Sequence, residues 1–384
     1  MNLKDCCVLI PSLEPDEKLP KYVKELAAGG FGQILVVDDG SGAQYQPIFE
    51  EIASWERCTV LHHPVNRGKG AALRTGFEHI LNHTDFQGVI TADSDGQHTV
   101  PDTQHLADLL APDKDELLLG SRDFSRKSKA VPPKSRMGNR ITSCIFALLY
   151  GHWLPDTQTG LRALNRHMLS EQLTVTGDRF EYEMNQLIYC AAHHIKMRVV
   201  PIETVYLNEN KGSHFHPFRD SWRIYKLILT GFFKFISSSL IATLIDLGIF
   251  SLVNSYVLQY LMSESKVEFF GEKLSARFLV ATAVARVCSS VVNFMLNKNF
   301  VFRLQKSKGA LTRYIILVIC VLIVSSLSVS VISNWLNIAP NSVLNTLVKA
   351  IVDTILFFLN FRIQKNWVFA QNQNVEGEIG RAHV

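Results

Sequence analysis

Residues 89–97 read Val-Ile-Thr-Ala-Asp-Ser-Asp-Gly-Gln, a short apolar run followed by two carboxylates one residue apart. The run 89–92 predicts a buried strand, so Asp93 and Asp95 would lie in the turn after its carboxyl end. Carboxylates spaced in this way can converge on one divalent cation, and Gln97 could add a carbonyl oxygen. Because an isolated D-x-D is more often a solvated acidic turn, the surrounding sequence has to decide between the two interpretations.

Similar apolar runs recur on both sides of this segment. Residues 6–10, 34–37 and 117–119 predict further strands, and residues 19–28 and 70–81 have the spacing of helices. Strands that alternate with helices indicate an α/β fold with a mostly parallel sheet. Ligands bind such sheets beyond the carboxyl ends of the strands. The polar residues there are therefore the candidate site.

Two further polar segments are candidates for ligand binding. Asp38 and Asp39 precede Gly40, which is turn chemistry, although Asp39 could also hydrogen-bond a nucleoside. The segment Asn66-Arg67-Gly68-Lys69-Gly70 opens the predicted helix 70–81. Its glycines could let backbone N–H groups approach a phosphate, with charge from Lys69, but a basic helix cap fits equally well. The spacing is not that of a Walker A loop.

A series of further motifs runs through residues 5–225 in order. They are Val8-Leu9-Ile10-Pro11 with Glu14, Val36-Val37-Asp38-Asp39-Gly40-Ser41, Asn66-Arg67-Gly68-Lys69-Gly70, Asp93-Ser94-Asp95-Gly96-Gln97, Gly120-Ser121-Arg122, Arg136-Met137-Gly138-Asn139, Asp156-Thr157-Gln158-Thr159-Gly160-Leu161-Arg162 and Phe180-Glu181. Together they resemble a family 2 glycosyltransferase of the dolichyl- and polyprenyl-phosphate sugar transferase type.

The resemblance implies a GT-A fold, a Rossmann-like α/β domain, and it implies roles for individual residues. The nucleotide-sugar donor would contact Pro11, Glu14, Asp38, Asp39, Lys69, Asp93, Asp156 and Gln158. Mg²⁺ or Mn²⁺ would be held by Asp93, Asp95 and Gln97. The phosphate of the acceptor lipid would meet Arg122, Arg136 and Lys211, the last in a segment that departs from the family pattern. Asp95, Arg122 and Arg136 would carry catalysis.

The expected chemistry suits these residue types. A lipid phosphate is already an anionic nucleophile near neutral pH, so no strong general base is needed. A metal would stabilise the leaving diphosphate, and arginines would align two anions that repel each other. Direct displacement would invert the anomeric centre. The sugar is not identified: UDP-glucose, UDP-N-acetylglucosamine and GDP-mannose all remain candidate donors.

The second half of the chain is dominated by apolar segments. Residues 235–258, 274–296, 314–336 and 343–361 are each long enough to span a bilayer. Charged residues inside them are costly and are expected to pair, and Arg286 could pair with Asp246 or Asp353. The pattern N-F-x-x-[NQ]-K-N-[FW]-V-F occurs at 293–302 and again at 360–369. These features predict two helix hairpins and resemble a GtrA-type domain.

We therefore predict a catalytic domain over residues 1–216, an interfacial helix over 217–233, a four-helix GtrA-like transmembrane domain over 234–370 and a disordered tail over 371–384. Residues 378–384 read like a translated sequencing adapter. The basic loop between the second and third spans favours a cytoplasmic catalytic domain and C-terminus, in a multi-pass protein of the inner or plasma membrane.

Composition excludes other classes. A net charge of +4 without basic runs beside aromatic residues argues against nucleic acid, and the seven cysteines lack metal-ligand spacing. The acceptor is expected to be undecaprenyl or dolichyl phosphate, and homo-oligomerisation is left open. Two alternatives are a lipid-linked sugar flippase with a regulatory soluble domain and a processive polysaccharide synthase. The synthase would need a Q-x-x-R-W motif, which the sequence lacks.

Overall fold

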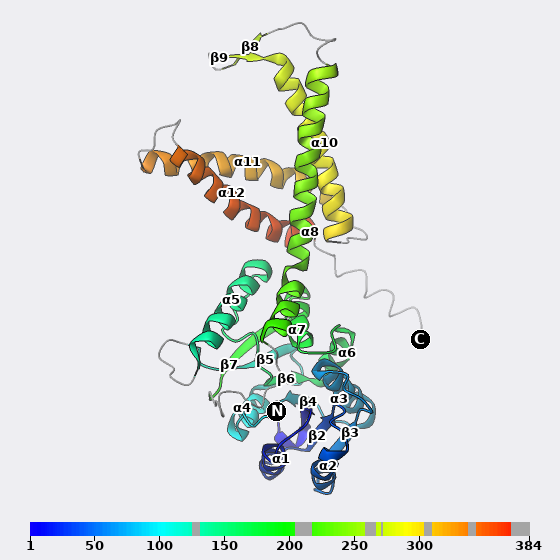
Figure 1. The fold of residues 1–384 in the computed structure, drawn as a ribbon. Coiled ribbons are helices and arrows are strands. Elements are labelled where there is room, and N and C mark those ends of the chain that lie inside the picture. The colour runs from blue at the N-terminus through cyan, green and yellow to red at the C-terminus, as the bar shows by residue number, and fades with distance from the viewer. Residues whose placement is uncertain are drawn as a thin grey trace. The chain divides into compact units, whose positions relative to one another are not determined.

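The computed structural model describes residues 1–124, 131–203, 217–257, 266–269, 272–302, 309–336 and 343–369. The chain divides into two compact units, Met1–Ile228 and Leu229–Val384 (Figure 1). The first unit is an α/β domain and the second is built from long helices. Helix α8 (Pro217–Leu252) contributes residues to both units.

A seven-stranded sheet forms the centre of the first unit, in the order β3-β2-β1-β4-β6-β5-β7. Strand β6 pairs antiparallel with β4 and β5, whereas every other pair is parallel. The predicted mostly parallel α/β fold is confirmed. The strands are β1 (Cys6–Ser12), β2 (Gln33–Asp38), β3 (Cys58–His62), β4 (Gly88–Thr91), β5 (Glu116–Ser121), β6 (Arg162–Asn165) and β7 (Lys196–Pro201).

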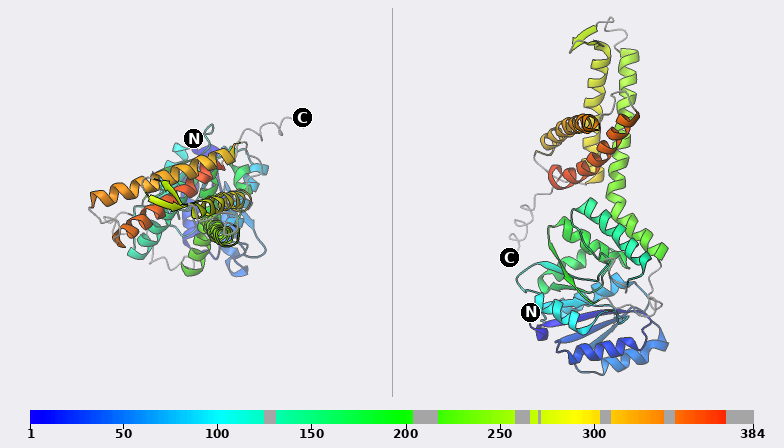
Figure 2. Two further views of the ribbon diagram at one scale, coloured as in Figure 1. Left: turned by 90° about the horizontal axis from the view of Figure 1, so that it is seen from above. Right: turned by 90° about the vertical axis from the view of Figure 1, so that its left-hand side faces the viewer.

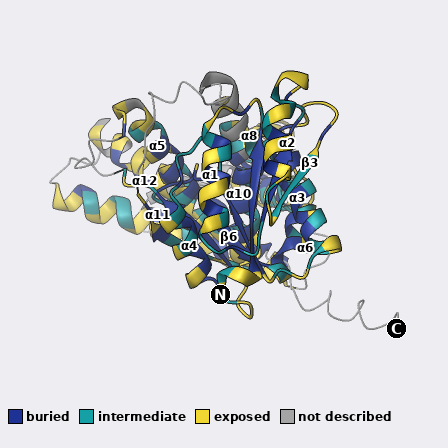
Figure 3. Cartoon of the chain, turned by 90° about the horizontal axis from the view of Figure 1, so that it is seen from below, coloured by how far each residue is buried: buried dark blue, intermediate teal, exposed yellow. Residues whose placement is uncertain are grey.

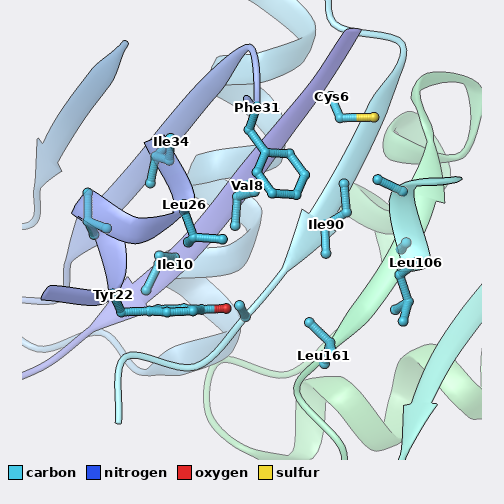
Figure 4. Packing of buried hydrophobic residues seen from close by; sticks show 14 of the residues in the cluster. Cys6, Val8, Ile10, Tyr22, Leu26, Phe31, Ile34, Ile90, Leu106 and Leu161 are labelled. Carbon is cyan, nitrogen blue, oxygen red and sulfur yellow. The ribbon is translucent and has the colours of Figure 1, made fainter. Parts of the chain in front are cut away.

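Helices flank this sheet because their apolar residues share one side. In α1 these are Leu19, Tyr22, Val23 and Leu26, at the spacing of one helix face. Figure 4 shows α1 side chains packed beside those of β1 and β4. Figure 3 shows the central strands in the buried colour, whereas β3 at the edge of the sheet is mostly intermediate. The helices are α1 (Lys18–Ala28), α2 (Gln46–Ala53), α3 (Lys69–His83), α4 (Val100–Leu109), α5 (Pro133–Tyr150), α6 (Arg166–Thr174) and α7 (Glu181–Ala192), with short 3₁₀ helices η1 (Leu3–Asp5) and η2 (Ala43–Tyr45).

The second unit contains a strand hairpin and three further long helices. Helices α11 and α12 run side by side (Figure 2). After α8 come η4 (Val253–Val257), β8 (Lys266–Phe269), β9 (Glu272–Ser275), α10 (Ala276–Leu296), η5 (Asn297–Val301), α11 (Ala310–Trp335), α12 (Val343–Ile363) and η6 (Gln364–Val368), where η4, η5 and η6 are π-helical turns.

Three helical stretches in the described part of the chain are long and apolar enough to cross a membrane. They are Ile228–Tyr256, Val280–Val301 and Ala310–Trp335. Each overlaps a predicted span, and the first begins seven residues before the predicted residue 235. The fourth predicted span, 343–361, forms helix α12 but is not among these three. Its passage through a membrane stays a prediction.

The internal repeat is visible in the structure of the second unit. Both copies end in a π-helical turn, η5 and η6. Asn297 and Gln364 occupy the same position in the two copies, are buried, and bond to each other at 2.9 Å. The aromatic residues that end the copies, Phe302 and Phe369, stack with their ring centroids 5.0 Å apart.

The predicted intramembrane ion pair is also present. Arg286 on α10 lies 3.7 Å from Asp246 on α8, which confirms the first of the two partners proposed for it. Asp246 also accepts a hydrogen bond from Ser289 at 3.0 Å. Asp353 has a different cation, because Lys349 lies 2.8 Å from it on the same helix.

Candidate active site

The parallel strands bring their carboxyl ends to one edge of the sheet. Ser12 of β1 lies in register with Asp38 of β2, and Leu9 of β1 with Thr91 of β4. Because β6 runs in the opposite direction, it begins at this edge, with Arg162 in register with Thr91. The loops after β1, β2, β4 and β5 therefore share the same edge, as the sequence predicts, and the loop before β6, a strand that was not predicted, joins them there.

Asp39, just after β2, organises the loop that leads into α3. Its carboxylate accepts hydrogen bonds from the backbone N–H groups of Arg67 at 2.9 Å and Gly68 at 2.7 Å. It also bonds to His63 Nδ1 at 2.7 Å, and the other ring nitrogen of His63 bonds to Thr75 at 2.9 Å. Asp39 is buried. These contacts fix the loop, while nucleoside binding by Asp39 stays a prediction.

Asp38, the last residue of β2, is linked through Ser41 to Glu14, which follows β1. Asp38 is buried and bonds to His62 Nδ1 and to the N–H of Ser41, both at 2.9 Å. Ser41 Oγ in turn accepts the N–H of Glu14 at 2.8 Å. Glu14 is exposed and has a φ of 50°, a left-handed conformation that turns the chain sharply after buried Pro11. The Glu14 carboxylate is thus presented to solvent at the sheet edge.

Asp93 lies at the centre of an ionic cluster. Lys69 Nζ lies 2.6 Å from Asp93 Oδ1, and His98 Nε2 lies 3.3 Å from Asp93 Oδ2. Burial alone would raise the pKa of Asp93, but the Lys69 ammonium and His98 outweigh it and hold that pKa well below its usual range. Lys69 also contacts Glu183, on α7, at 3.0 Å. Burial alone would lower the pKa of Lys69, but the two carboxylates raise it.

The glycines of the Asn66–Gly70 segment allow close packing against α7. A Cβ at Gly68 would lie 2.4 Å from the carbonyl oxygen of Asp178, and one at Gly70 would lie 2.5 Å from Tyr182 Cβ. The N–H of Ala71 donates to Asp178 O at 3.0 Å. The N–H groups of residues 67, 68 and 71 are thus used within the protein. The glycines therefore serve close packing here, while contact of this segment with a phosphate stays a prediction.

Asp95 is the carboxylate best placed for a metal. Burial and the neighbouring Asp93 raise its pKa, which a bound divalent cation would reverse. Its Oδ1 accepts the N–H of Gln97 at 3.0 Å, which folds the D-x-D turn. Asp95 and Gln97 supply the oxygen ligands that Mg²⁺ and Mn²⁺ take, so they fit such an ion. Asp93 differs from Asp95 in that cationic or polar side chains, Lys69 and His98, contact both of its oxygens. In the described ranges, no three His, Cys, Asp or Glu side chains gather as a metal site.

Arg122 follows β5 and is held by Asp156. Arg122 Nε donates to Asp156 Oδ2 at 2.8 Å and its Nη2 to Oδ1 at 3.2 Å, a bidentate pair. Asp156 also accepts the N–H of Gln158 at 3.1 Å. Asn139 of α5 accepts the N–H of Thr157 at 3.2 Å, so α5 holds the same loop. The predicted residues Arg122, Asp156 and Gln158 are therefore brought together.

The remaining predicted residues have different outcomes. Arg136 lies on α5 and donates to Val131 O at 3.2 Å. Lys211 lies outside the described residues. Two members of the Asp93 cluster, His98 and Glu183, are not among the residues predicted from the sequence. His98 directly follows the D-x-D-x-Q motif, which was an available signal. Glu183 is 114 residues from Lys69, and no local pattern joins them.

Comparison with known proteins identifies the family of the chain. The model of Glycosyl transferase family 2 matches residues 7–173. An uncharacterized protein of Methanocaldococcus jannaschii is 31% identical over 208 residues, which cover 54% of this chain and 84% of that protein. The chain belongs to glycosyl transferase family 2. The model of the GtrA/DPMS transmembrane domain matches residues 234–369 of this family 2 glycosyltransferase, which is therefore a membrane protein.

Two further similarities involve proteins of stated activity. The UDP-N-acetylglucosamine–dolichyl-phosphate N-acetylglucosaminyltransferase of Methanococcus voltae is 28% identical over 216 residues, which cover 52% of this chain and 85% of that enzyme. Glucosyl-3-phosphoglycerate synthase of Mycobacterium tuberculosis, solved with Mn²⁺, UDP and glucosyl-3-phosphoglycerate, has a TM-score of 0.43 and 16% identity. That match covers 59% of this chain and 78% of the solved one.

Proposed function

We propose that this family 2 glycosyltransferase moves a hexose from a nucleotide-sugar to a polyprenyl phosphate, either undecaprenyl or dolichyl phosphate. The observation that carries the proposal is the shared sheet edge, where the Asp93–Asp95 turn follows β4 and the Arg122–Asp156 pair follows β5. Acidic groups that can hold a metal and a fixed guanidinium are what a reaction between two phosphorylated molecules requires. The activity of the M. voltae relative supports the lipid acceptor.

Each group has a separate task in the proposed reaction. Asp95 and Gln97 would hold Mg²⁺ or Mn²⁺, which supplies charge stabilisation for the departing diphosphate. Arg122, kept rigid by Asp156, would orient the acceptor phosphate, and Arg136 would assist from α5. The acceptor oxygen would displace the nucleotide directly and invert the anomeric centre. No side chain is required to remove a proton from the acceptor.

Helix α5 supports an acceptor at the lipid surface. Met137, Ile141 and Leu148 are 64%, 45% and 41% exposed, and their spacing puts them on one side of the helix. Tyr150 OH, at the end of α5, donates to Ile228 O at 3.3 Å. Ile228 is also the first residue of the first candidate span, so the C-terminal end of α5 contacts the residue at which that span begins. An apolar stripe beside basic residues is typical of helices that lie in the membrane interface.

The division of the chain follows from this proposal. Residues 1–216 would catalyse transfer, residues 217–233 would lie at the interface, and residues 234–370 would hold the enzyme in the membrane through four spans. The basic residues at 298–313 favour a cytoplasmic active site and C-terminus in a plasma or inner membrane. Lys211 would contact the acceptor phosphate.

The full chain in membranes tests this function. Membranes would be incubated with labelled UDP-glucose, UDP-N-acetylglucosamine or GDP-mannose and with undecaprenyl or dolichyl phosphate, with and without EDTA. We expect one sugar per lipid phosphate with one donor preferred, and loss of product with EDTA or in Asp95→Ala. Full transfer by Asp95→Ala, or transfer that ignores EDTA, would refute the metal site. A polymeric product would favour a processive synthase, and lipid-sugar transport without transfer would favour a flippase.

A further inference from the structure

The Lys69 ammonium lies between carboxylates from two parts of the chain. Asp93 Oδ1, after β4, is 2.6 Å away, and Glu183, in the first turn of α7, is 3.0 Å away. The Lys69 side chain is only 17% exposed and that of Glu183 only 11%. One carboxylate would suffice to neutralise this lysine. The second carboxylate therefore needs a reason other than charge balance.

The reason is that a second carboxylate restricts the position of the Lys69 ammonium. A lysine side chain has four rotatable bonds, and an ammonium with one partner can pivot about that partner. Acceptors on two sides fix the ammonium and, through it, the Asp93 carboxylate. The remaining Asp93 oxygen is held by His98 at 3.3 Å. With Glu183 in place, Asp93 is restrained from both sides.

The position of Glu183 is itself set by packing. The backbone oxygen of Glu183 accepts a hydrogen bond from Arg162 Nη1 at 2.8 Å. Arg162 is fully buried at the start of β6 and also bonds to Gln186 on α7 at 2.7 Å. The close approach at Gly70 joins the first turn of α7 to the start of α3. The backbone at Glu183 is thus fixed beside the start of α3, with its carboxylate within reach of Lys69.

We propose that Glu183 is a positioning residue for sugar transfer, which acts through Lys69 to hold Asp93 in the geometry that the donor needs. The inference rests on the proposed function. It assigns a role to α7, which lies outside residues 7–173, the segment matched by the family model. Glu183 itself touches neither donor nor acceptor in this scheme.

Four variants of the full chain test the proposal: Glu183→Gln, Lys69→Met, their combination, and Glu78→Gln as a control for an exposed glutamate on α3. Glu183→Gln keeps the shape of the side chain and one acceptor. We expect its kcat to fall about tenfold while the donor KM changes less than about threefold, because an interaction that only positions reacting groups acts mainly on kcat. Glu78→Gln should match the unchanged chain.

The combined variant decides whether Glu183 acts through Lys69. If it does, Glu183→Gln added to Lys69→Met should cost no more than about a further twofold in kcat, because the two losses are not independent. Unchanged kcat in Glu183→Gln, or losses that multiply in the combined variant, would overturn the proposal. Calorimetric UDP or GDP binding with Mg²⁺ gives a second readout, expected to change less than kcat.

Two controls keep the outcomes separable. If Glu183→Gln does not insert or fold, Glu183→Asp replaces it, because this variant keeps the charge on a shorter side chain. Its kcat should fall by less than that expected for Glu183→Gln. Full activity in both single variants, Glu183→Asp and Lys69→Met, would overturn the inference. If the unchanged chain transfers no sugar to any polyprenyl phosphate, the proposed function fails. If the unchanged chain is active and Glu183→Gln has the same kcat, only the positioning role of Glu183 is refuted.

Discussion

Replacing Gly160 by alanine should strongly lower the rate of sugar transfer, because it displaces Asp93. The added Cβ would lie 2.4 Å from Asp93 Oδ2 and 2.5 Å from Oδ1, whereas a carbon and an oxygen in contact prefer roughly 3.3 Å. Gly160 cannot retreat freely, because its carbonyl oxygen accepts a hydrogen bond from Thr91 Oγ1 at 2.8 Å. Asp93 must therefore move by about 1 Å, and a displacement of that size can cost about a hundredfold in rate.

The assay is the rate of lipid-linked sugar formation by the purified full chain at saturating donor. Gly231→Ala is the matched control, since a Cβ there meets nothing within 4 Å. We expect Gly160→Ala to lose about two orders of magnitude in kcat and Gly231→Ala to lose less than about twofold. Gly160→Ala activity above half that of the unchanged chain would refute the argument, since it would show that the Asp93 position is not critical.

Three further predictions follow from single contacts. Asp39→Ala removes the acceptor of three hydrogen bonds and should lower the free energy of unfolding by about 2–5 kcal/mol, measured by denaturant titration. Asn297→Leu removes the donor to Gln364 Oε1 and should destabilise the second unit by about 1 kcal/mol in mixed micelles; adding Gln364→Leu should recover part of that loss. Arg122→Lys keeps the charge but not the bidentate contact with Asp156, so transfer of labelled sugar should fall at least about tenfold; unchanged activity would contradict that role.

Much of the fold was predictable because its signals are local. Strands β1, β2, β4 and β5 are apolar runs followed directly by polar turns, and a strand buried on both faces reads in that way. Strand β6 was not predicted because its first and last residues, Arg162 and Asn165, are polar. Both are nevertheless buried and form hydrogen bonds inside the protein. Its antiparallel direction depends on partners distant in the sequence. No periodicity within four residues could reveal it.

The same distinction applies to the candidate site. Asp93 and Asp95 could be named because they follow one strand at short spacing. The partners of Lys69 could not be named, because its contact with Glu183 depends on the packing of α3 against α7. The glycines beside Lys69 were visible in the sequence, but their role was ambiguous: a Gly-rich helix start suits an approaching phosphate and an approaching helix equally well.

The amide contact in the second unit relates the two repeats to each other. Asn297 and Gln364 are 67 residues apart, hold the same position in their repeats, and touch each other. A contact between equivalent positions is the one that two identical hairpins would make across a two-fold axis. Because glutamine is longer than asparagine by one methylene, the two sides of this amide pair are not interchangeable in the present chain.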